Sequence, residues 1–302
     1  FLIEGDEETG SALLKNAILK NKKNLKCDCV IISDGGLIGD DSPAFEASFR
    51  GSSNIEVCLQ TGKDDLHSGL FGGSVPNAAE ELSLLISKLH DKNKRILIPG
   101  FYDRAKRQKI ASGGNEISLK KLTGTKKVFV RNNGEFETRT GLEPAIEVTG
   151  FMSGYIDAGF RNSVPRKATA KINLRFAPEQ DPKKMILLIK KFLINNTPKY
   201  VDIKITGTDS SPGANLDFDN EFAKRAEKIL TYVYKKIPAI KHCGGTLPIV
   251  NDFKEILGVP QVMIPLANED CGMHSASENI SVTSVRNGLS FSEKMFSDFH
   301  IQ

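Results

Sequence analysis

Four residues with metal-binding side chains follow apolar stretches that predict strands in this 302-residue chain: two follow 1–3, one follows 30–33, and one lies in the loop after 259–266. They are Glu7, Glu8, Asp34 and His274. Side chains just past the carboxyl ends of strands in an open α/β sheet converge on one crevice, so we expect these four to lie close together. Carboxylates and imidazole form a ligand set suited to zinc or manganese. In the adjacent Glu7-Glu8 pair, one carboxylate can bind metal while its neighbour accepts a proton from the attacking water.

Each of these residues also has a purely structural interpretation. Asp34 precedes Gly35-Gly36 and suits a turn, and Glu7-Glu8-Thr9 suits the start of the helix that follows. A single histidine such as His274 in a loop is often held by structural contacts. Spacing alone leaves both interpretations open.

A second histidine, His67, lies in a glycine-flanked turn between an expected strand and an expected helix. Its imidazole could donate a hydrogen bond to a developing oxyanion. The alternative is a loop histidine whose nitrogens are satisfied by backbone groups.

Residues suited to binding a carboxylate occur later in the chain. Arg175 lies on the polar face of the expected strand 168–176, and arginine is the side chain best shaped to grip a carboxylate with two parallel hydrogen bonds. Asn162 could supply an amide to the same carboxylate. The turn Gly244-Gly245-Thr246 would let backbone N–H groups approach a ligand closely. The polar face of the strand could instead simply be solvated.

The elements that must position these residues follow from hydrophobic periodicity. Both ends of the chain predict strand–helix units: helices over 10–21, 220–236, 251–258 and 281–299, and buried strands over 29–33 and 259–266. The middle predicts alternating strands over 55–60, 128–131, 145–148, 168–176 and 200–206, helices from Asn77 and Asp181, and a polar excursion over 103–127. The fold class is therefore α/β, with a discontinuous domain over 1–52 and 208–302 and an inserted α+β domain over 53–207.

Composition narrows the class of protein. The chain has 39% hydrophobic and 26% charged residues, which is typical of a globular protein. A net charge of +4 without a long basic block argues against nucleic-acid binding. No apolar run approaches the ~20 residues of a membrane span. Five scattered cysteines favour small buried thiols in a reducing compartment, and hence a cytoplasmic protein.

Taken together, these motifs resemble the carnosine-dipeptidase branch of the di-zinc exopeptidases, a superfamily that includes acetylornithine deacetylase and succinyl-diaminopimelate desuccinylase. The resemblance extends over nearly the whole chain. It is carried, in order, by Glu4-Gly5-Asp6-Glu7-Glu8-Thr9-Gly10-Ser11, Ser33-Asp34, His67-Ser68-Gly69-Leu70-Phe71-Gly72-Gly73, Pro99-Gly100-Phe101-Tyr102-Asp103, Asn162-x-Val164-Pro165, Arg175, Gly244-Gly245-Thr246-x-Pro248 and His274-Ser275.

The resemblance implies a role for each position. Glu7 corresponds to the general base that activates a metal-bridging water and then protonates the leaving amine. Glu8 and His274 correspond to ligands of one zinc, and Asp34 to a ligand of the other. His67 corresponds to a histidine that stabilises the oxyanion in the partner subunit's site.

The resemblance also implies a substrate and an assembly. Asn162 and Arg175 correspond to residues that hold the substrate carboxylate, also across the subunit boundary, with the turn 244–246 beside them. The expected activity is hydrolysis of dipeptides or short peptides with a free C-terminal carboxylate. The inserted domain is then a lid that forms a homodimer.

The chain departs from the family pattern at its start. The family's first zinc-binding motif, His-x-Asp followed by a bridging Asp, precedes the Glu-Glu pair, and the 302 residues contain no such segment there. Because zinc normally takes three protein ligands and a water, we expect these residues alone to hold an incomplete two-metal site. The chain is expected to be part of a longer enzyme. The alternatives are an N-acyl amino-acid deacylase with the same machinery, and a non-catalytic dimeric remnant of the fold.

Overall fold

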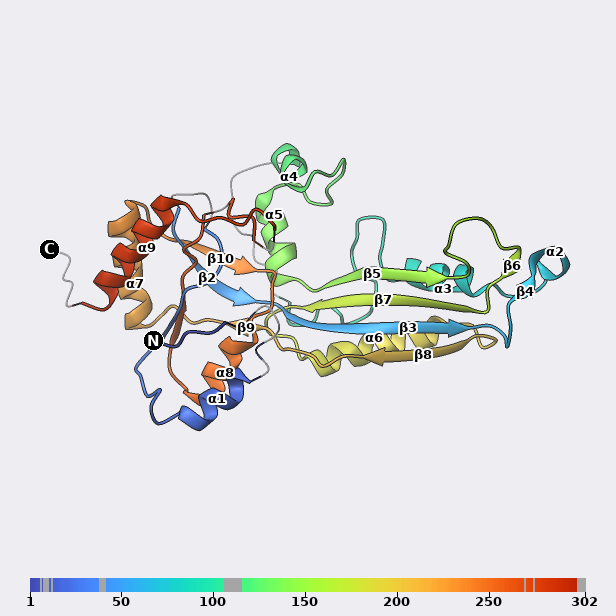
Figure 1. Ribbon diagram of the computed structural model, residues 1–302, viewed down its shortest axis with the longest axis horizontal. Coiled ribbons are helices and arrows are strands. Elements are labelled where there is room, and N and C mark those ends of the chain that lie inside the picture. Colours follow the sequence, from blue (N-terminus) through green and yellow to red (C-terminus); the bar gives the residue numbers. More distant parts are fainter. Residues whose placement is uncertain are drawn as a thin grey trace. The chain divides into compact units, whose positions relative to one another are not determined.

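The computed structural model describes residues 1–5, 7, 11, 13–37, 42–105, 116–268, 270–273 and 275–297 (Figure 1). The chain divides into two compact units. Unit 1 comprises Phe1–Phe49, Ala214–Cys243 and Leu247–Gln302, and unit 2 comprises Arg50–Gly213 and Gly244–Thr246.

Unit 1 is built from parallel strand pairs with helices beside them. Strand β1 pairs in parallel with β11, and β2 pairs in parallel with β10 and antiparallel with β9. The strands are β1 (Val30–Ile32), β2 (Ala44–Phe49), β9 (Ala214–Asn215), β10 (Ala239–Cys243) and β11 (Gln261–Met263). The helices are α1 (Leu14–Asn21), α7 (Glu221–Tyr234), α8 (Pro248–Ile256) and α9 (Val282–Met295).

Alternating side chains of β11 face two different helix layers. Val262 belongs to a buried cluster formed with α7 and α9, whereas Met263 packs with Val250 of α8. Helix α7 can cover a strand because its buried positions, which include Ala226 and Leu230, recur at helical spacing. Its first turn is capped by Asn220, whose side chain accepts a hydrogen bond from the Ala223 N–H.

Three strands of unit 1, β2, β9 and β10, were not predicted from the sequence. All six residues of β2 are buried, and they include Glu46 and Ser48, which break the apolar run that would have signalled a buried strand. Strand β10 carries mixed polar residues. The predicted helix 251–258 instead begins at Pro248, which suits the first helical position, and the predicted strand 259–266 is regular only over Gln261–Met263.

Unit 2 is centred on a four-stranded antiparallel sheet in the order β5-β7-β3-β8. Its strands are β3 (Gly51–Gln60), β5 (Ala145–Ser153), β7 (Lys167–Phe176) and β8 (Asp202–Gly207), with the short pair β4 (Leu66–His67) and β6 (Ser163–Val164). Its helices are α2 (Ser68–Phe71), α3 (Ala78–Ser87), α4 (Glu116–Thr123), α5 (Asn133–Glu137), the π-helix η2 (Thr138–Leu142) and α6 (Pro182–Asn196).

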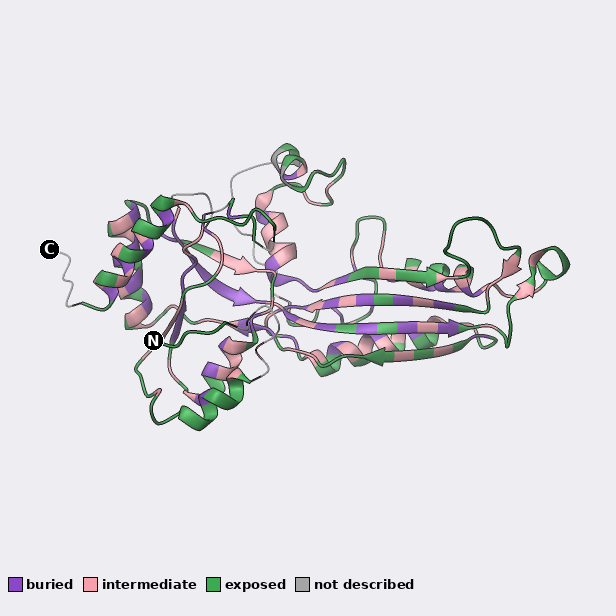
Figure 2. Ribbon diagram, viewed as in Figure 1, coloured by how far each residue is buried: buried purple, intermediate pink, exposed green. Residues whose placement is uncertain are grey.

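One face of this sheet forms the core of unit 2. Buried residues of β3 and β7 such as Val57 and Ile172 pack with Leu82 of α3 and Ile189 of α6. The residues between them on each strand are more exposed, which gives the alternating colours of the strands in Figure 2. The four-stranded sheet therefore presents a polar face opposite its two helices.

The polar excursion contains more structure than the sequence predicted. Within the described residues, α4 forms part of the region predicted as a loop over 103–127. The strand predicted over 128–131 is wrong, because this segment has no strand partner among the described residues and Phe129 is substantially exposed. Strand preference is a preference for a paired, half-buried surface, and Val128-Phe129-Val130 lacks one.

Among the residues that the structure describes, no helix combines the length and the apolar character that a membrane crossing requires.

Candidate functional site

Two of the predicted metal-site residues line one cavity in unit 1. Glu7 and Asp34 both border a cavity of about 790 Å³, which is also lined by β1 and by Leu247. Asp34 lies two residues beyond β1, and its Oδ1 accepts a hydrogen bond from the Gly35 N–H at 2.7 Å. Both side chains are exposed to solvent. Asp34 is thus held in a turn, as one interpretation of the sequence expected, and within the described part of the chain its Oδ2 accepts no hydrogen bond.

The remaining predicted metal ligands, Glu8 and His274, lie outside the described residues. Within the described part of the chain, no three His, Cys, Asp or Glu side chains gather closely enough to hold a metal ion. The predicted metal centre therefore stays a prediction.

An ion pair between a buried carboxylate and a half-buried ammonium contacts the backbone just after Asp34, and no sequence motif predicts it. Lys241 Nζ lies 3.2 Å from Oε1 of Glu46 and donates a hydrogen bond to the Gly36 carbonyl at 2.8 Å. Burial raises the pKa of the Glu46 carboxyl, and the Lys241 ammonium opposes that effect. Glu46 lies in β2, a strand that the sequence does not predict, so the sequence carries no signal for this ion pair.

His67 and Asn162 lie together beside the short β4–β6 pair. His67 is paired with Ser163, and the Asn162 carbonyl accepts a hydrogen bond from the Ser68 N–H at 3.1 Å. Figure 1 shows β4, α2 and β6 gathered beyond one end of the four-stranded sheet. His67 caps α2, because its Nδ1 accepts a hydrogen bond from the Gly69 N–H at 3.1 Å. An accepting Nδ1 leaves the proton of a neutral imidazole on Nε2, which is then available as a donor.

Arg175 lies on the polar face of the sheet and contacts the predicted turn. Its Nη1 donates to Thr246 Oγ1 at 3.1 Å, and its Nε donates to Asn173 Oδ1 at 3.2 Å. Asn173 is itself held by Asn54, to which its amide donates at 2.8 Å. These contacts fix the plane of a half-buried guanidinium, while Nη2 has no acceptor among the described residues. A guanidinium oriented in this way is suited to binding a carboxylate.

The two groups of residues lie at opposite ends of β7. His67 and Asn162 lie beyond the end that contains Lys167, whereas Arg175 is near the other end. Arg175 is eight positions further along β7 than Lys167, which at ~3.3 Å per residue places the two residues roughly 26 Å apart. Asn162 and Arg175 of one subunit therefore cannot hold the same small carboxylate.

Sequence reasoning missed Arg50, which joins β2 to β3. Its backbone N–H donates to the Gly245 carbonyl at 3.0 Å, and its own carbonyl accepts from Thr246 Oγ1 at 2.7 Å. It therefore contacts the same turn as Arg175. An arginine at the end of a strand carries no motif signal, so only the structure could reveal this contact.

Comparison with known proteins gives one family match and several relatives. Residues 50–201 match the model of the peptidase dimerisation domain. The Cys-Gly metallodipeptidase DUG1 of Candida albicans is 27% identical over 299 residues, which covers 94% of this chain and 61% of that protein. The Beta-Ala-His dipeptidase of Homo sapiens is 26% identical over 320 residues, with 100% and 61% covered. The chain thus spans about three-fifths of the length of these curated relatives.

Two solved structures have the same fold. Human carnosine dipeptidase 1 matches with a TM-score of 0.80 at 24% identity, over 97% of this chain and 64% of that one. The M20 family metallo-carboxypeptidase Sso-CP2 of Sulfolobus solfataricus matches with a TM-score of 0.81 at 28% identity, over 97% and 68%. The predicted α/β fold with an inserted domain and the predicted family resemblance are both confirmed. The chain belongs to the M20 family of metallopeptidases, whose dimerisation domain forms most of its unit 2.

Proposed function

We propose that this chain belongs to a metal-dependent dipeptidase, which hydrolyses dipeptides or short peptides with a free C-terminal carboxylate. The observation that carries the proposal is the match to curated dipeptidases over 94–100% of the chain. The polar face of unit 2 supports it, because Arg175 is fixed there with one nitrogen, Nη2, left for a ligand.

The metal centre belongs to unit 1 in this proposal. Glu8 and His274 would hold one divalent ion and Asp34 the other, with zinc as the metal and manganese as the alternative. The donor set fits, because carboxylates and imidazole are ligands of both metals, and Asp34 borders the cavity that Glu7 also lines, with only its Oδ1 hydrogen-bonded among the described residues. When bound, the ions supply Lewis acidity to the substrate carbonyl.

Glu7 and His67 would carry the proton and charge movements of hydrolysis. Glu7 accepts a proton from the attacking water and delivers it to the leaving amine. His67 donates from Nε2 to the developing oxyanion, a role that its accepting Nδ1 favours.

Selection for a free carboxylate would come from Arg175, Asn162 and the turn Gly244-Gly245-Thr246. We propose that the active protein is a homodimer in which unit 2 is the lid and dimerisation domain. His67 and Asn162 would then act in the partner's site, because they lie roughly 26 Å or more from Arg175 along the sheet of their own subunit.

The proposed location is the cytoplasm. The observation behind it is that none of the five cysteines, all of which lie in the described part of the chain, forms a disulfide. Unpaired thiols are typical of a reducing compartment.

The decisive variant is Glu7→Gln in the full-length protein. It should lower kcat for dipeptides by a factor of ~10² or more, because a glutamine cannot accept the proton, while metal content stays at the wild-type value. Elemental analysis and initial rates, measured on the same preparation, check both statements. Full activity in the variant would contradict the role of Glu7.

A substrate panel separates dipeptidase from deacylase activity. Dipeptides should be cleaved faster than the matching N-acetyl amino acids. The opposite order would assign the same machinery to N-acyl amino-acid deacylation, and no turnover of either class by a metal-loaded protein would favour a non-catalytic member of the fold.

A further inference from the structure

Within unit 2, the turn Gly244-Gly245-Thr246 is held by Arg50. Three contacts join them: the Arg50 N–H donates to Gly245 O at 3.0 Å, the Arg50 Nε donates to Gly244 O at 3.0 Å, and Thr246 Oγ1 donates to Arg50 O at 2.7 Å. Both the main chain and the side chain of one residue thus hold all three residues of the turn. This explains why the turn clusters with unit 2, although the residues on either side of it belong to unit 1.

The packing at Gly244 leaves little room for any other position of the turn. A Cβ at Gly244 would lie 2.6 Å from the Thr140 carbonyl oxygen and 3.0 Å from Arg50 Nη2. The absence of a side chain at position 244 therefore allows the turn to pack closely against both the π-helix η2 and the Arg50 guanidinium. π-Helical turns are often found at functional sites.

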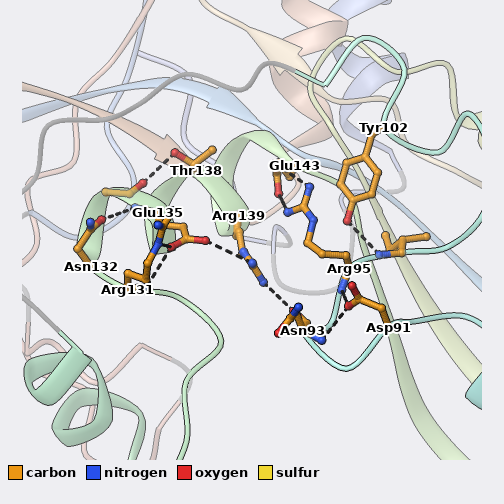
Figure 3. Close-up of polar contacts among 12 residues, drawn as sticks. Asp91, Asn93, Arg95, Tyr102, Arg131, Asn132, Glu135, Thr138, Arg139 and Glu143 are labelled. Atoms are coloured by element: carbon orange, nitrogen blue, oxygen red, sulfur yellow. Dashed lines mark hydrogen bonds and ion pairs between the residues drawn. The ribbon is translucent and has the colours of Figure 1, made fainter.

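The Arg50 guanidinium is itself anchored on the other side. Its Nη1 is directed to the carbonyls of Arg139 and Glu143, at 3.5 and 3.4 Å. The Glu143 carboxylate is buried and accepts hydrogen bonds from both terminal nitrogens of Arg95 (Figure 3). In the same view, the guanidinium of Arg139 donates to Glu135 and to the Asn93 carbonyl. The backbone that receives the Arg50 guanidinium is therefore fixed by a network of ion pairs.

The hydroxyl group of Thr246 connects Arg50 to Arg175. Thr246 has a single O–H, and it is committed to the Arg50 carbonyl. The lone pairs of that oxygen are left to accept the bond from Arg175 Nη1 at 3.1 Å. Arg50 thus sets both the position of Thr246 and the direction in which its oxygen accepts.

We propose that Arg50 is a positioning residue for carboxylate recognition: it holds the Gly244–Thr246 turn so that Thr246 orients the Arg175 guanidinium toward the substrate. The inference rests on the proposed carboxylate-binding role of Arg175. Arg50 itself makes no contact with substrate in this arrangement. A displaced turn would leave Arg175 in place on β7 but free to rotate, which affects binding of a carboxylate more than chemistry at the peptide bond.

Arg50→Lys in the full-length protein tests this, with a glycine-terminated dipeptide and its C-terminal amide as the two substrates. Lysine keeps the charge but cannot donate to Gly244 O and to the η2 carbonyls together. We expect KM for the dipeptide to rise about tenfold or more, kcat to change less, and KM for the amide to stay within twofold. Gly244→Ala should reproduce this pattern, because it displaces the same turn from the other side.

Lys204→Arg is the control. Lys204 is an exposed residue of β8 whose side chain contacts neither Arg50 nor the turn among the described residues, so its variant should behave as wild type on both substrates. Equal losses on dipeptide and amide, together with a lowered melting temperature, would make Arg50 a structural residue and overturn the proposal. Unchanged kinetics in Arg50→Lys and Gly244→Ala would overturn it as well.

A second readout separates this inference from the proposed function. If the wild-type protein cleaves no dipeptide, the proposed function fails, and hydrogen exchange of the peptide that contains residues 244–246 decides the role of Arg50. Faster exchange in Arg50→Met than in wild type, with the rest of unit 2 unchanged, supports the positioning role. Equal exchange in the two proteins contradicts it.

Discussion

The imidazole of His67 illustrates how one backbone contact can define the chemistry of a side chain. Because Nδ1 accepts the Gly69 N–H, a neutral ring carries its proton on Nε2. The contact that caps the helix thus also prepares a donor. The two interpretations of this histidine from the sequence, a structural loop residue and an oxyanion donor, are therefore compatible.

His67→Asn separates the two roles. Asparagine is among the best N-cap residues, so α2 and the melting temperature should be preserved. Its shorter side chain cannot place a donor where Nε2 lies, and kcat of the full-length protein should fall by ~10². Steady-state kinetics and thermal unfolding measured together check this, and an unchanged kcat would remove His67 from the proposed mechanism.

Arg175→Lys tests the carboxylate contact itself. A lysine ammonium cannot keep the hydrogen bonds to Thr246 and Asn173 while also facing a carboxylate, so kcat/KM for a dipeptide should fall by about 10–100-fold. The C-terminal amide of the same dipeptide should be less affected. Lys171→Arg, an exposed position on the same strand face, is the control and should leave both rates unchanged. Equal losses on the two substrates would contradict a carboxylate-specific role.

At the scale of elements, the length of β7 decides which residues can share a site. A strand of ten residues holds its two ends apart, so His67 and Asn162 are separated from Arg175 by rigid backbone. The segment after α3, by contrast, is a tight connection. His90 forms an isolated β-bridge with Ile96, and the Leu97 N–H donates a hydrogen bond to the Leu89 carbonyl.

The stability of this connection should depend on pH through His90. Burial lowers the pKa of His90 from its usual value of 6.5, and nearby Lys94 adds to that effect, whereas Glu147 and Asp91 oppose it. Below about pH 6.5, His90 is protonated more readily in the unfolded chain than in the folded chain. The free energy of unfolding therefore falls as pH falls through this value.

His90→Gln should lose part of this pH dependence, because glutamine does not titrate. Urea unfolding followed by circular dichroism, at pH values above and below 6.5, measures the difference between the two proteins. We expect the free energy of unfolding to decrease less on acidification in the variant than in wild type. An identical decrease in both would show that His90 does not contribute.

At the scale of the whole molecule, the proposed dimer can be tested by complementation. Glu7→Gln and His67→Asn subunits should each be inactive as homodimers. If His67 acts in the partner's site, a mixed dimer contains one site with both an intact Glu7 and an intact His67. Random mixing of equal amounts should then restore about a quarter of wild-type activity.

The measurement is activity after the two full-length variants are unfolded and refolded together, compared with the same treatment of each variant alone. Mixing without refolding is the control, since intact dimers exchange subunits slowly or not at all. No recovery from a co-refolded sample that contains mixed dimers would place His67 in the site of its own subunit.

The sequence by itself was sufficient for the family, the α/β class and the inserted domain. Periodicity fixes which face of α7 or β3 is buried, and short motifs are local, so both can be recognised without knowing what they contact. It was not sufficient for β2, where the buried Glu46 and Ser48 interrupt the apolar pattern, nor for Val128–Arg131, whose strand-like residues find no partner strand in the described chain.

Only the tertiary structure decided which site residues are neighbours. Arg50, Arg175 and Thr246 are far apart in the sequence, and the contacts among them depend on how β3, β7 and the turn after β10 are brought together. The separation of Asn162 from Arg175 likewise follows from strand pairing and not from spacing in the chain. Residue types and local periodicity are properties of the sequence, whereas the position of one charged group relative to another is set by packing over the whole unit.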